Sequence, residues 1–261
     1  IIKKNSKFIK NIFFPNSKLN YAENLLPKKN NDIAIKFFSE NGNKKEITWK
    51  QLNMKVGKFS YFLKKINLKE KDRVAAYVPN CIESVIAFLS VSKNGLIWSS
   101  CSPDFGIKAV IDRFLQIKPK VLITCEYYFY NGKKINILKK IPEITKKINS
   151  IKKVIVFPYD KSFKIKLSSG YINFNSAIEK SKIDLQFKKY KFNHPLYILY
   201  SSGTTGRPKC ITHGSGNVLI EHNKEMSLHF NIKNNNKVFY YTSTGWMMWN
   251  WLIGILSSGA T

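Results

Sequence analysis

Short apolar segments alternate with helix-like segments along most of the chain, and this alternation limits the fold more than any other feature. Apolar runs predict strands at 33–38, 73–78, 96–99, 121–125 and 154–157. Apolar residues at steps of three and four predict helices at 49–66, 82–89, 107–117 and 135–148. Strands that alternate with helices imply an α/β fold with mostly parallel sheets that helices cover.

The second half of the chain has a weaker pattern at first and a clearer one later. Residues 158–193 are rich in Lys and Ser, and we expect an irregular connection there with one short helix near 176–180. Further strands are expected from 197, at 210–213 and at 238–242, with a helix at 217–229. The chain therefore divides into a first sheet region at 1–157, a connection at 158–193 and the start of a second sheet region at 194–261.

Residues 197–209, YILYSSGTTGRPK, pass from a strand-like run into a loop rich in glycine and hydroxyl groups. Gly203 and Gly206 can adopt positive φ and let backbone N–H groups approach an anion. Hydroxyl groups add donors, and Lys209 adds a charge that suits phosphate. The candidate phosphate contacts are Ser201, Ser202, Gly203, Thr204, Thr205, Gly206 and Lys209.

This loop differs from the P-loop of nucleoside triphosphatases, which needs Gly-Lys-Ser/Thr. Here Arg207, Pro208 and Lys209 follow Gly206. A plain Ser/Thr/Gly linker after a strand is the alternative interpretation. We favour a phosphate-binding loop, because two glycines, four hydroxyls and a nearby Pro-Lys pair directly after a strand are an unusual combination for a linker.

The segment SSGTTGRPK at 201–209 resembles the signature loop of the acyl-adenylate-forming enzymes, which include the acyl-CoA synthetases and the luciferases. In that family the loop holds the phosphates of ATP. Further segments resemble the acyl-CoA synthetases that activate acetoacetate, and they are spread over nearly the whole chain. These are NYAENLL at 20–26, DRVAAYVPN at 72–80, IWSSCSPDFG at 97–106, DRFLQIKPKVL at 112–122 and TSTGWMMWNW at 242–251.

Residues 242–251 hold an aromatic and thioether cluster of the kind that forms the apolar wall of a small pocket. Core packing would use the same residues and is the alternative. By resemblance, Trp246, Met247 and Met248 match positions that line the acyl pocket of short-chain synthetases. We therefore expect these three residues to contact the acid substrate.

The resemblance implies an ATP-dependent acid–thiol ligase that forms acetoacetyl-CoA from acetoacetate, ATP and CoA through an acyl-adenylate, with Mg²⁺ as part of the ATP complex. An acetyl- or propionyl-CoA synthetase of the same family is the alternative. The resemblance also implies an incomplete N-terminal large domain, without the C-terminal lid that carries the adenylation lysine. We expect no catalytic residue in this chain and no turnover by the chain alone.

The chain has 44 Lys+Arg against 16 Asp+Glu, a formal net charge of +28. Taken alone, that excess would suggest a basic nucleic-acid-binding module, a different class of protein. Arginine occurs only as Arg73, Arg113 and Arg207, however, and the lysines come with abundant Asn, Ile, Phe and Tyr, all favoured by A+T-rich codons. We therefore attribute the charge to composition and expect no specific nucleic-acid partner.

The cysteines and histidines show no spacing typical of a metal site or a disulfide framework. The four cysteines include no CxxC pair, and His222 and His229 are two helical turns apart. We expect reduced thiols, no metal site and surface or helix-face histidines without a catalytic role. The most apolar run, 246–256, is too short for a membrane span and no signal peptide is evident, so we predict a soluble cytoplasmic protein.

Overall fold

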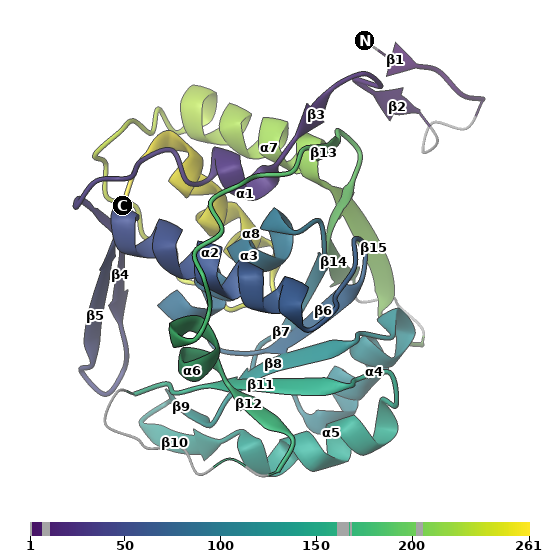
Figure 1. Ribbon diagram of the computed structural model, residues 1–261, viewed down its shortest axis with the longest axis vertical. Coiled ribbons are helices and arrows are strands. Elements are labelled where there is room, and N and C mark those ends of the chain that lie inside the picture. Colours follow the sequence, from purple (N-terminus) through teal and green to yellow (C-terminus); the bar gives the residue numbers. More distant parts are fainter. Residues whose placement is uncertain (1, 7–10, 161–166, 168, 202–205) are drawn as a thin grey trace.

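The computed structural model describes residues 2–6, 11–160, 167, 169–201 and 206–261. Its centre is a seven-stranded sheet in the order β12-β11-β8-β6-β7-β14-β15 (Figure 1). The strands are β6 (Arg73–Tyr77), β7 (Ile97–Cys101), β8 (Val121–Cys125), β11 (Lys153–Phe157), β12 (Tyr171–Asn173), β14 (Pro195–Ser201) and β15 (Lys209–Gly214). All neighbours run parallel except β14 and β15, which are antiparallel. The expected α/β fold with a mostly parallel sheet is confirmed.

Helices cover both faces of this sheet because its connections run in two directions. The helix α3 (Ile82–Lys93) leads from β6 to β7, and α4 (Ile107–Ile117) leads from β7 back across β6 to β8. Right-handed crossovers in opposite directions place their helices on opposite faces. The helices α2 (Trp49–Lys65) and α6 (Phe174–Glu179) lie on the α3 side, and α5 (Ile141–Lys147) lies on the α4 side (Figure 1).

The remaining elements surround this centre. The other α-helices are α1 (Tyr21–Asn24), α7 (Ser215–Lys224) and α8 (Met247–Gly254). Short antiparallel pairs are formed by β1 (Ile2–Lys3) with β2 (Ile12–Phe13), β3 (Lys18–Leu19) with β13 (Tyr190–Lys191), and β4 (Ile33–Phe38) with β5 (Lys44–Thr48). None of the helices in the described residues is long and apolar enough to cross a membrane.

The helix α2 begins at Trp49, the residue at which the helix is expected to begin, directly after its cap residue Thr48. Thr48 accepts a hydrogen bond from the backbone N–H of Gln51, and the Gln51 side chain accepts one from the backbone N–H of Thr48. This capping box satisfies two N–H groups that the first helical turn leaves without partners. A local sequence signal therefore sets the start of the longest helix.

A hairpin replaces the first part of the helix expected at 135–148. The strands β9 (Tyr127–Tyr130) and β10 (Lys133–Asn136) pair across Asn131 and Gly132, whose φ values are 50° and 70°. Positive φ at both central residues is the geometry that a two-residue hairpin turn requires, and Asn-Gly adopts it readily. The helix is confined to α5, after a 3₁₀ turn at Leu138–Lys140.

The second sheet expected from residue 194 onward is not a separate sheet in the described residues, because β14 and β15 extend the sheet of β6 and β7. Residues 238–242, all of them described, form no strand, so that expectation is wrong. The Val238 N–H donates to the Thr261 carbonyl at 2.9 Å, but no strand pairs along the rest of the segment. The helix expected at 217–229 is α7 followed by a π-helical turn at Glu225–His229. The three-part division of the chain stays a prediction.

Large aromatic side chains join α3, β7 and α8 in the core. The Phe88 ring lies 5.8 Å from that of Trp98 and 5.6 Å from that of Trp249. The rings of Trp98 and Trp249 stack at 6.1 Å. All three side chains are buried. Within the aromatic segment 242–251, core packing is therefore the role of Trp249.

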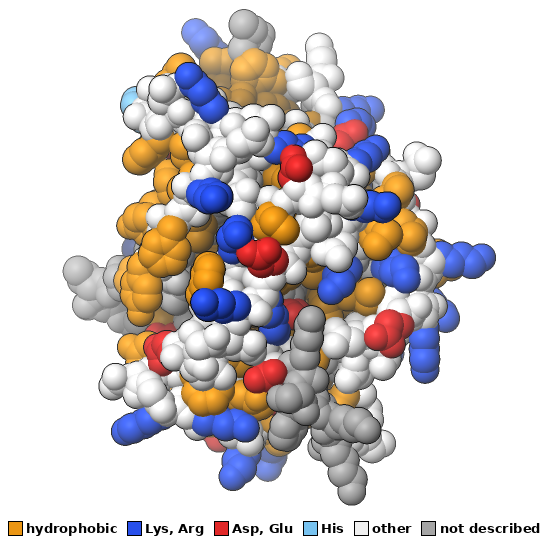
Figure 2. Space-filling model, turned by 90° about the vertical axis from the view of Figure 1, so that its left-hand side faces the viewer, with side chains coloured by type: hydrophobic (Ala, Val, Ile, Leu, Met, Phe, Trp, Pro, Cys, Tyr) orange, Lys and Arg blue, Asp and Glu red, His pale blue; other side chains and the backbone are white. Residues whose placement is uncertain are grey.

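Positive side chains are widely distributed on the surface. Figure 2 shows lysine and arginine spread over one face of the molecule, with hydrophobic side chains gathered along one side of it. A nucleic-acid site usually appears as a concentrated basic stripe or patch. On this face the distribution instead resembles a general excess of lysine.

Candidate functional site

A cavity of about 600 Å³ opens at the carboxyl edge of the sheet. It lies beyond the ends of β6 and β7, where Asn80 and Ser102 line it. The chain leaves these two strands toward opposite faces of the sheet, so their exits separate and leave a crevice. Ligands of open α/β sheets bind at such switch points, and this cavity, the switch-point cavity, is therefore the candidate site.

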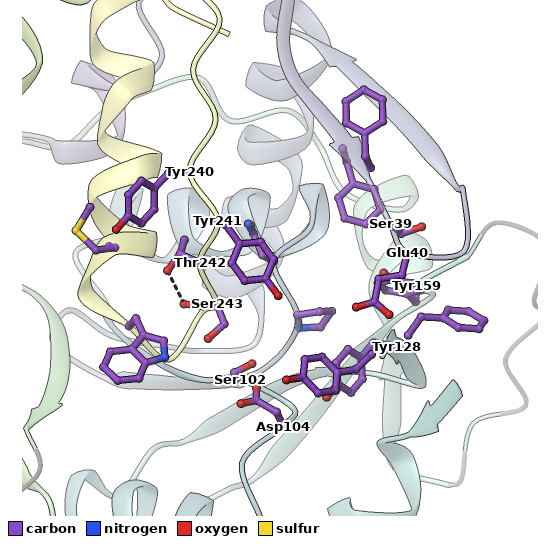
Figure 3. A pocket seen from close by; sticks show the side chains of 18 residues that line it. Ser39, Glu40, Ser102, Asp104, Tyr128, Tyr159, Tyr240, Tyr241, Thr242 and Ser243 are labelled. Atoms are coloured by element: carbon purple, nitrogen blue, oxygen red, sulfur yellow. Dashed lines mark hydrogen bonds between the residues drawn. The ribbon is translucent and has the colours of Figure 1, made fainter. Parts of the chain in front are cut away.

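Aromatic side chains from segments far apart in the sequence line the switch-point cavity. Figure 3 shows Tyr240 and Tyr241 on one side of it and Tyr128 and Tyr159 on the other. The aromatic lining residues are Phe37, Phe38, Tyr128, Phe129, Tyr130, Tyr159, Tyr240, Tyr241 and Trp246. Glu40 and Asp104 also line it, whereas no lysine or arginine does so among the described residues.

Buried hydrogen bonds hold the segment 242–249 against the strand ends. The Thr244 hydroxyl donates to the Val78 carbonyl at 2.6 Å, and the Ser100 hydroxyl donates to the Thr244 carbonyl at 2.7 Å. The Trp249 indole N–H donates to Asn80 Oδ1 at 2.9 Å. The segment is thus tied to the exits of both β6 and β7, which determines where its side chains enter the cavity.

Gly245 lets this segment pass close to the loop after β7. A Cβ atom at this position would meet Cζ of Phe105 at 3.0 Å and the backbone N of Ser102 at 3.4 Å. Contacts of this length leave little room for a side chain. Close packing therefore explains why a glycine stands at position 245, directly before Trp246.

The structure brings two of the three expected substrate contacts to the switch-point cavity. Trp246 and Met248 line it, and the Trp246 side chain is 65% exposed. Met247 is not among the lining residues and is 49% exposed. The role of all three in substrate binding stays a prediction, and the geometry favours Trp246 and Met248.

The candidate nucleotide loop connects β14 to β15 at the same edge of the sheet. Ser201, the last residue of β14, pairs with Lys209, the first residue of β15. Gly206 has a φ of 90°, which favours glycine, and the side chains of Arg207 and Lys209 are exposed. The other expected phosphate contacts, Ser202, Gly203, Thr204 and Thr205, lie outside the described residues.

The helix α4 connects the exit of this loop with the switch-point cavity. Gln116 Nε2 donates to the Pro208 carbonyl at 2.9 Å. One turn earlier, the Arg113 guanidinium lies 4.8 Å from the Phe105 ring and 5.7 Å from the Tyr200 ring. Since Phe105 also packs at Gly245, contacts run continuously from β14 to the segment 242–249. The two candidate sites are therefore neighbours.

Burial keeps the phenols and thiols near the switch-point cavity in their neutral forms. It raises the pKa of Tyr128 and of Tyr159 above the usual range. It also raises the pKa of the buried thiols of Cys81 and Cys101. Among the described residues, no group of three or more His, Cys, Asp or Glu is placed to hold a metal ion. The cavity thus presents apolar surface, uncharged hydroxyl groups and the carboxyl groups of Glu40 and Asp104 to a ligand.

Two of the histidines that follow the loop, His213 and His222, are packed against other groups, whereas His229 is exposed. His222, expected at the surface or on a helix face, lies on α7 and is buried beside α8, and burial lowers its pKa to about 4. A Cβ atom on Gly254 would meet His222 Nδ1 at 2.3 Å, so the ring packs directly on the α8 backbone. The His213 ring lies 5.0 Å from that of Tyr197, and burial lowers its pKa as well. Both rings are neutral packing elements at neutral pH.

Several cavity residues were not identified from the sequence. Tyr128 and Tyr159 follow the carboxyl ends of β8 and β11, and Tyr241 belongs to a segment predicted as a strand. The available signal was position, because side chains that follow parallel strands meet at one edge of the sheet. That rule would have pointed to Tyr128 and Tyr159.

The carboxyl group of Glu126, beside the cavity wall, should make the stability of the protein depend on pH. Both of its carboxylate oxygens accept the backbone N–H of Tyr159 at 2.9 Å, and burial raises its pKa from 4.5 to about 7. Between these values the folded state holds a proton that the unfolded state has lost, so stability falls as pH rises through this window. Glu126→Gln should remove this contribution and flatten the profile of melting temperature between about pH 5 and about pH 8.

The matched control is Glu143→Gln, which removes an exposed carboxylate from α5 and corrects for the change in net charge. Thermal unfolding of the complete protein at several pH values gives the comparison. A Glu126→Gln profile as steep as that of the control would show that Glu126 does not titrate in this window.

Residues 23–261 match the model of the family described as AMP-binding enzyme. The chain is 43% identical over 258 residues to acetoacetyl-CoA synthetase of Gallus gallus and 40% identical over 250 residues to acetoacetyl-coenzyme A synthetase of Rhizobium meliloti. It is 36% identical over 263 residues to malonamoyl-CoA synthetase of Penicillium aethiopicum. These alignments cover 95% of this chain but only 39%, 38% and 36% of the three relatives.

A solved structure shows the same relation. Acetoacetyl-CoA synthetase from Streptomyces lividans aligns with a TM-score of 0.90 and 34% sequence identity, over 96% of this chain and 39% of that chain. The chain thus spans less than two fifths of the relatives that it matches. Because the family model covers all but the first 22 residues, the chain belongs to the family of AMP-binding enzymes.

Proposed function

We propose that the complete protein is an ATP-dependent acid–thiol ligase that forms acetoacetyl-CoA from acetoacetate, ATP and CoA. The observation that carries the proposal is the similarity to acetoacetyl-CoA synthetases, at 43% and 40% identity over 95% of the chain. The nucleotide loop and the switch-point cavity, neighbours at one sheet edge, support it. The chain alone is expected not to turn over, and the adenylation lysine is expected in the remaining part of the protein.

The proposed reaction has two steps. A carboxylate oxygen of the acid attacks the α-phosphorus of ATP, the bond to the bridging β-phosphate oxygen breaks, and an acyl-adenylate and pyrophosphate result. The sulfur of CoA then attacks the acyl carbon, the thiol proton is released, and AMP leaves with the electrons of the carbon–oxygen bond. Adenylation makes the second step possible because AMP is a far better leaving group than oxide.

In the first step the protein mainly positions reactants and balances charge. The loop 201–209 would hold the phosphates through backbone N–H groups, hydroxyls and Lys209, and Mg²⁺ would enter with ATP and offset part of the phosphate charge. Trp246 and Met248 would contact the apolar part of the acid. No described lysine or arginine lines the switch-point cavity, so the described residues would leave the carboxylate of the acid unpaired and available to the α-phosphorus.

An acid-preference assay tests the proposal. The complete protein, given ATP and CoA, should show its highest kcat/KM with acetoacetate when acetoacetate, malonamate, propionate and acetate are compared. A clear preference for acetate or propionate would support the alternative short-chain synthetase. Release of AMP and pyrophosphate in equal amounts is expected with every acid that reacts.

We further propose that the enzyme works in the cytoplasm on small molecules, without a specific nucleic-acid or membrane partner. The composition supports this, because the net charge of +28 comes almost entirely from lysine. Lysine charge of this kind attracts polyanions weakly and in a salt-dependent way, without reading sequence.

A further inference from the structure

A second cavity, of about 530 Å³, opens at the opposite edge of the sheet. Its lining residues come from the amino ends of the strands: Glu70 and Lys71 precede β6, and His194 and Pro195 lie at the start of β14. The short pair β3–β13 forms another wall. No residue lines both this amino-edge cavity and the switch-point cavity, so the two are separate.

The amino-edge cavity is enriched in lysine beyond the composition of the chain. Five of its fourteen lining residues are lysines, namely Lys18, Lys71, Lys188, Lys189 and Lys191. In the whole chain 41 of 261 residues are lysine. Among the described residues, no lysine lines the switch-point cavity, although that cavity is larger. A purely compositional excess would place lysines in both cavities. The concentration at one of them indicates a local preference for an anion.

The lysines of this cavity are only partly neutralised by carboxylates. Lys188 pairs with Glu70 at 3.0 Å, and Lys189 pairs with Glu23. Lys18, Lys71 and Lys191 form no ion pair with any described residue. Three lysines therefore lie at the cavity outside any ion pair, and Glu70, the carboxylate that lines it among the described residues, is paired with Lys188 and also attracts Lys71.

Two of these lysines oppose each other directly. Lys18 on β3 and Lys191 on β13 are register partners in an antiparallel pair. Like charges at opposed positions of such a pair repel and lower stability. A ligand with several negative charges, placed between the two ammonium groups, would convert this repulsion into two attractive contacts.

The inner wall of the cavity is packed and aromatic. The rings of Tyr190 and His194 lie 4.6 Å apart, and those of Phe14 and Phe192 lie 4.7 Å apart. His194 is buried, its Nε2 bonds the Gly95 carbonyl at 2.9 Å, and its Nδ1 lies 3.6 Å from Glu70 Oε1. This wall is fixed by packing, so the lysines stand around a preformed hollow rather than on a flat surface.

We propose that the amino-edge cavity binds a small, multiply charged phosphate anion, held by Lys18, Lys71 and Lys191. Lysine is a compact positive charge that suits phosphate, and several lysines around one hollow suit more than one phosphate charge. The hollow accepts a small molecule, whereas a nucleic acid requires a stripe of cations along a groove. This site lies at the edge of the sheet opposite to the nucleotide loop, and the proposal does not depend on the proposed ligase activity.

Calorimetric titration with inorganic pyrophosphate tests the proposal in the complete protein. All variants carry Lys209→Ala, so that binding at the nucleotide loop is weakened equally in each. Lys18→Ala/Lys191→Ala should weaken pyrophosphate binding by at least about tenfold, since each lysine contributes a charge-assisted contact. The control Lys55→Ala/Lys65→Ala removes two exposed lysines from α2, with the same loss of charge, and should change the affinity little.

Thermal unfolding separates binding from a structural role. Without ligand, Lys18→Ala/Lys191→Ala should melt no lower than the control, because it removes a repulsive pair. Pyrophosphate should raise the melting temperature of the parent and of the control, and much less that of Lys18→Ala/Lys191→Ala.

Three results would overturn the proposal. Equal weakening in both double variants would show diffuse attraction by the whole surface. Unchanged affinity in Lys18→Ala/Lys191→Ala would show that the phosphate binds elsewhere. Binding of a single-stranded oligonucleotide that needs Lys18 and Lys191, without binding of pyrophosphate, would assign the surface to a macromolecule.

Discussion

Alanine in place of Lys209 should slow ATP–pyrophosphate exchange by the complete protein about ten- to a hundred-fold. A hydrogen bond to a charged group contributes about 1.5–3 kcal/mol, which corresponds to that loss in rate. The side chain is exposed at the exit of the nucleotide loop, and no described carboxylate pairs with it. It is therefore free to meet a phosphate.

The loop should keep its shape in this variant. The pairing of Ser201 with Lys209 uses backbone groups, and the bond from Gln116 to the Pro208 carbonyl is independent of the lysine side chain. The loss should therefore appear as weaker use of ATP and not as unfolding. Lys237→Ala, which removes an exposed lysine far along the chain from the loop, is the control and should leave exchange unchanged.

Trp246→Ala provides the contrasting variant in the same assay. Trp246 lines the switch-point cavity, so its loss should raise the apparent KM for the acid and leave that for ATP nearly unchanged. If instead the ATP dependence shifts with Trp246→Ala while Lys209→Ala is silent, the nucleotide and acid sites are assigned the wrong way round.

Alanine in place of Gly95 should destabilise the protein by about 2–5 kcal/mol, through two separate causes. Gly95 has a φ of 64°, a conformation that costs an L-residue with a Cβ about 1–2 kcal/mol. The added Cβ would also lie 2.5 Å from Cε1 and from Cζ of the Tyr190 ring. Displacing a packed ring of this kind costs about 1–3 kcal/mol more.

Gly132→Ala separates the two causes. Gly132 has a φ of 70°, close to that of Gly95, but a Cβ there would meet no atom within 4 Å. It should therefore show only the cost of the backbone conformation. Urea denaturation of the two variants gives the difference, and equal losses would mean that the Tyr190 ring moves aside at no cost.

Local patterns were sufficient for most of the strands and helices of the sheet region. The period of apolar residues located α2, α3 and α4, and the start expected at residue 49 is where the capping box of Thr48 and Gln51 begins α2. The hairpin β9–β10 was also within reach, because Asn131-Gly132 is a strong turn signal directly after the aromatic run Tyr127–Tyr130. The hairpin was missed because the helix was expected to begin at residue 135, whereas α5 begins at Ile141.

The segment 238–242 could not be assigned correctly from its own residues. Its apolar and aromatic residues have the composition of a strand, but a strand forms only where a partner backbone runs beside it. In the described residues its backbone meets Thr261 at one end, and the side chains of Tyr240 and Tyr241 line the switch-point cavity instead. The residues that give this segment the composition of a strand therefore form part of the wall of the switch-point cavity.

The sequence by itself determined the α/β class, through the period of its apolar residues over short stretches, and the family, through the resemblance of segments such as 201–209 to its motifs. Only the tertiary structure decided that Trp246 lines a cavity whereas Trp249, three residues on, belongs to the core. It also decided that cavities lie at both sheet edges, one without lysine among the described residues and one rich in it. Each cavity joins loops that are far apart in the chain, and their meeting depends on the order of strands in the sheet, which no local pattern records.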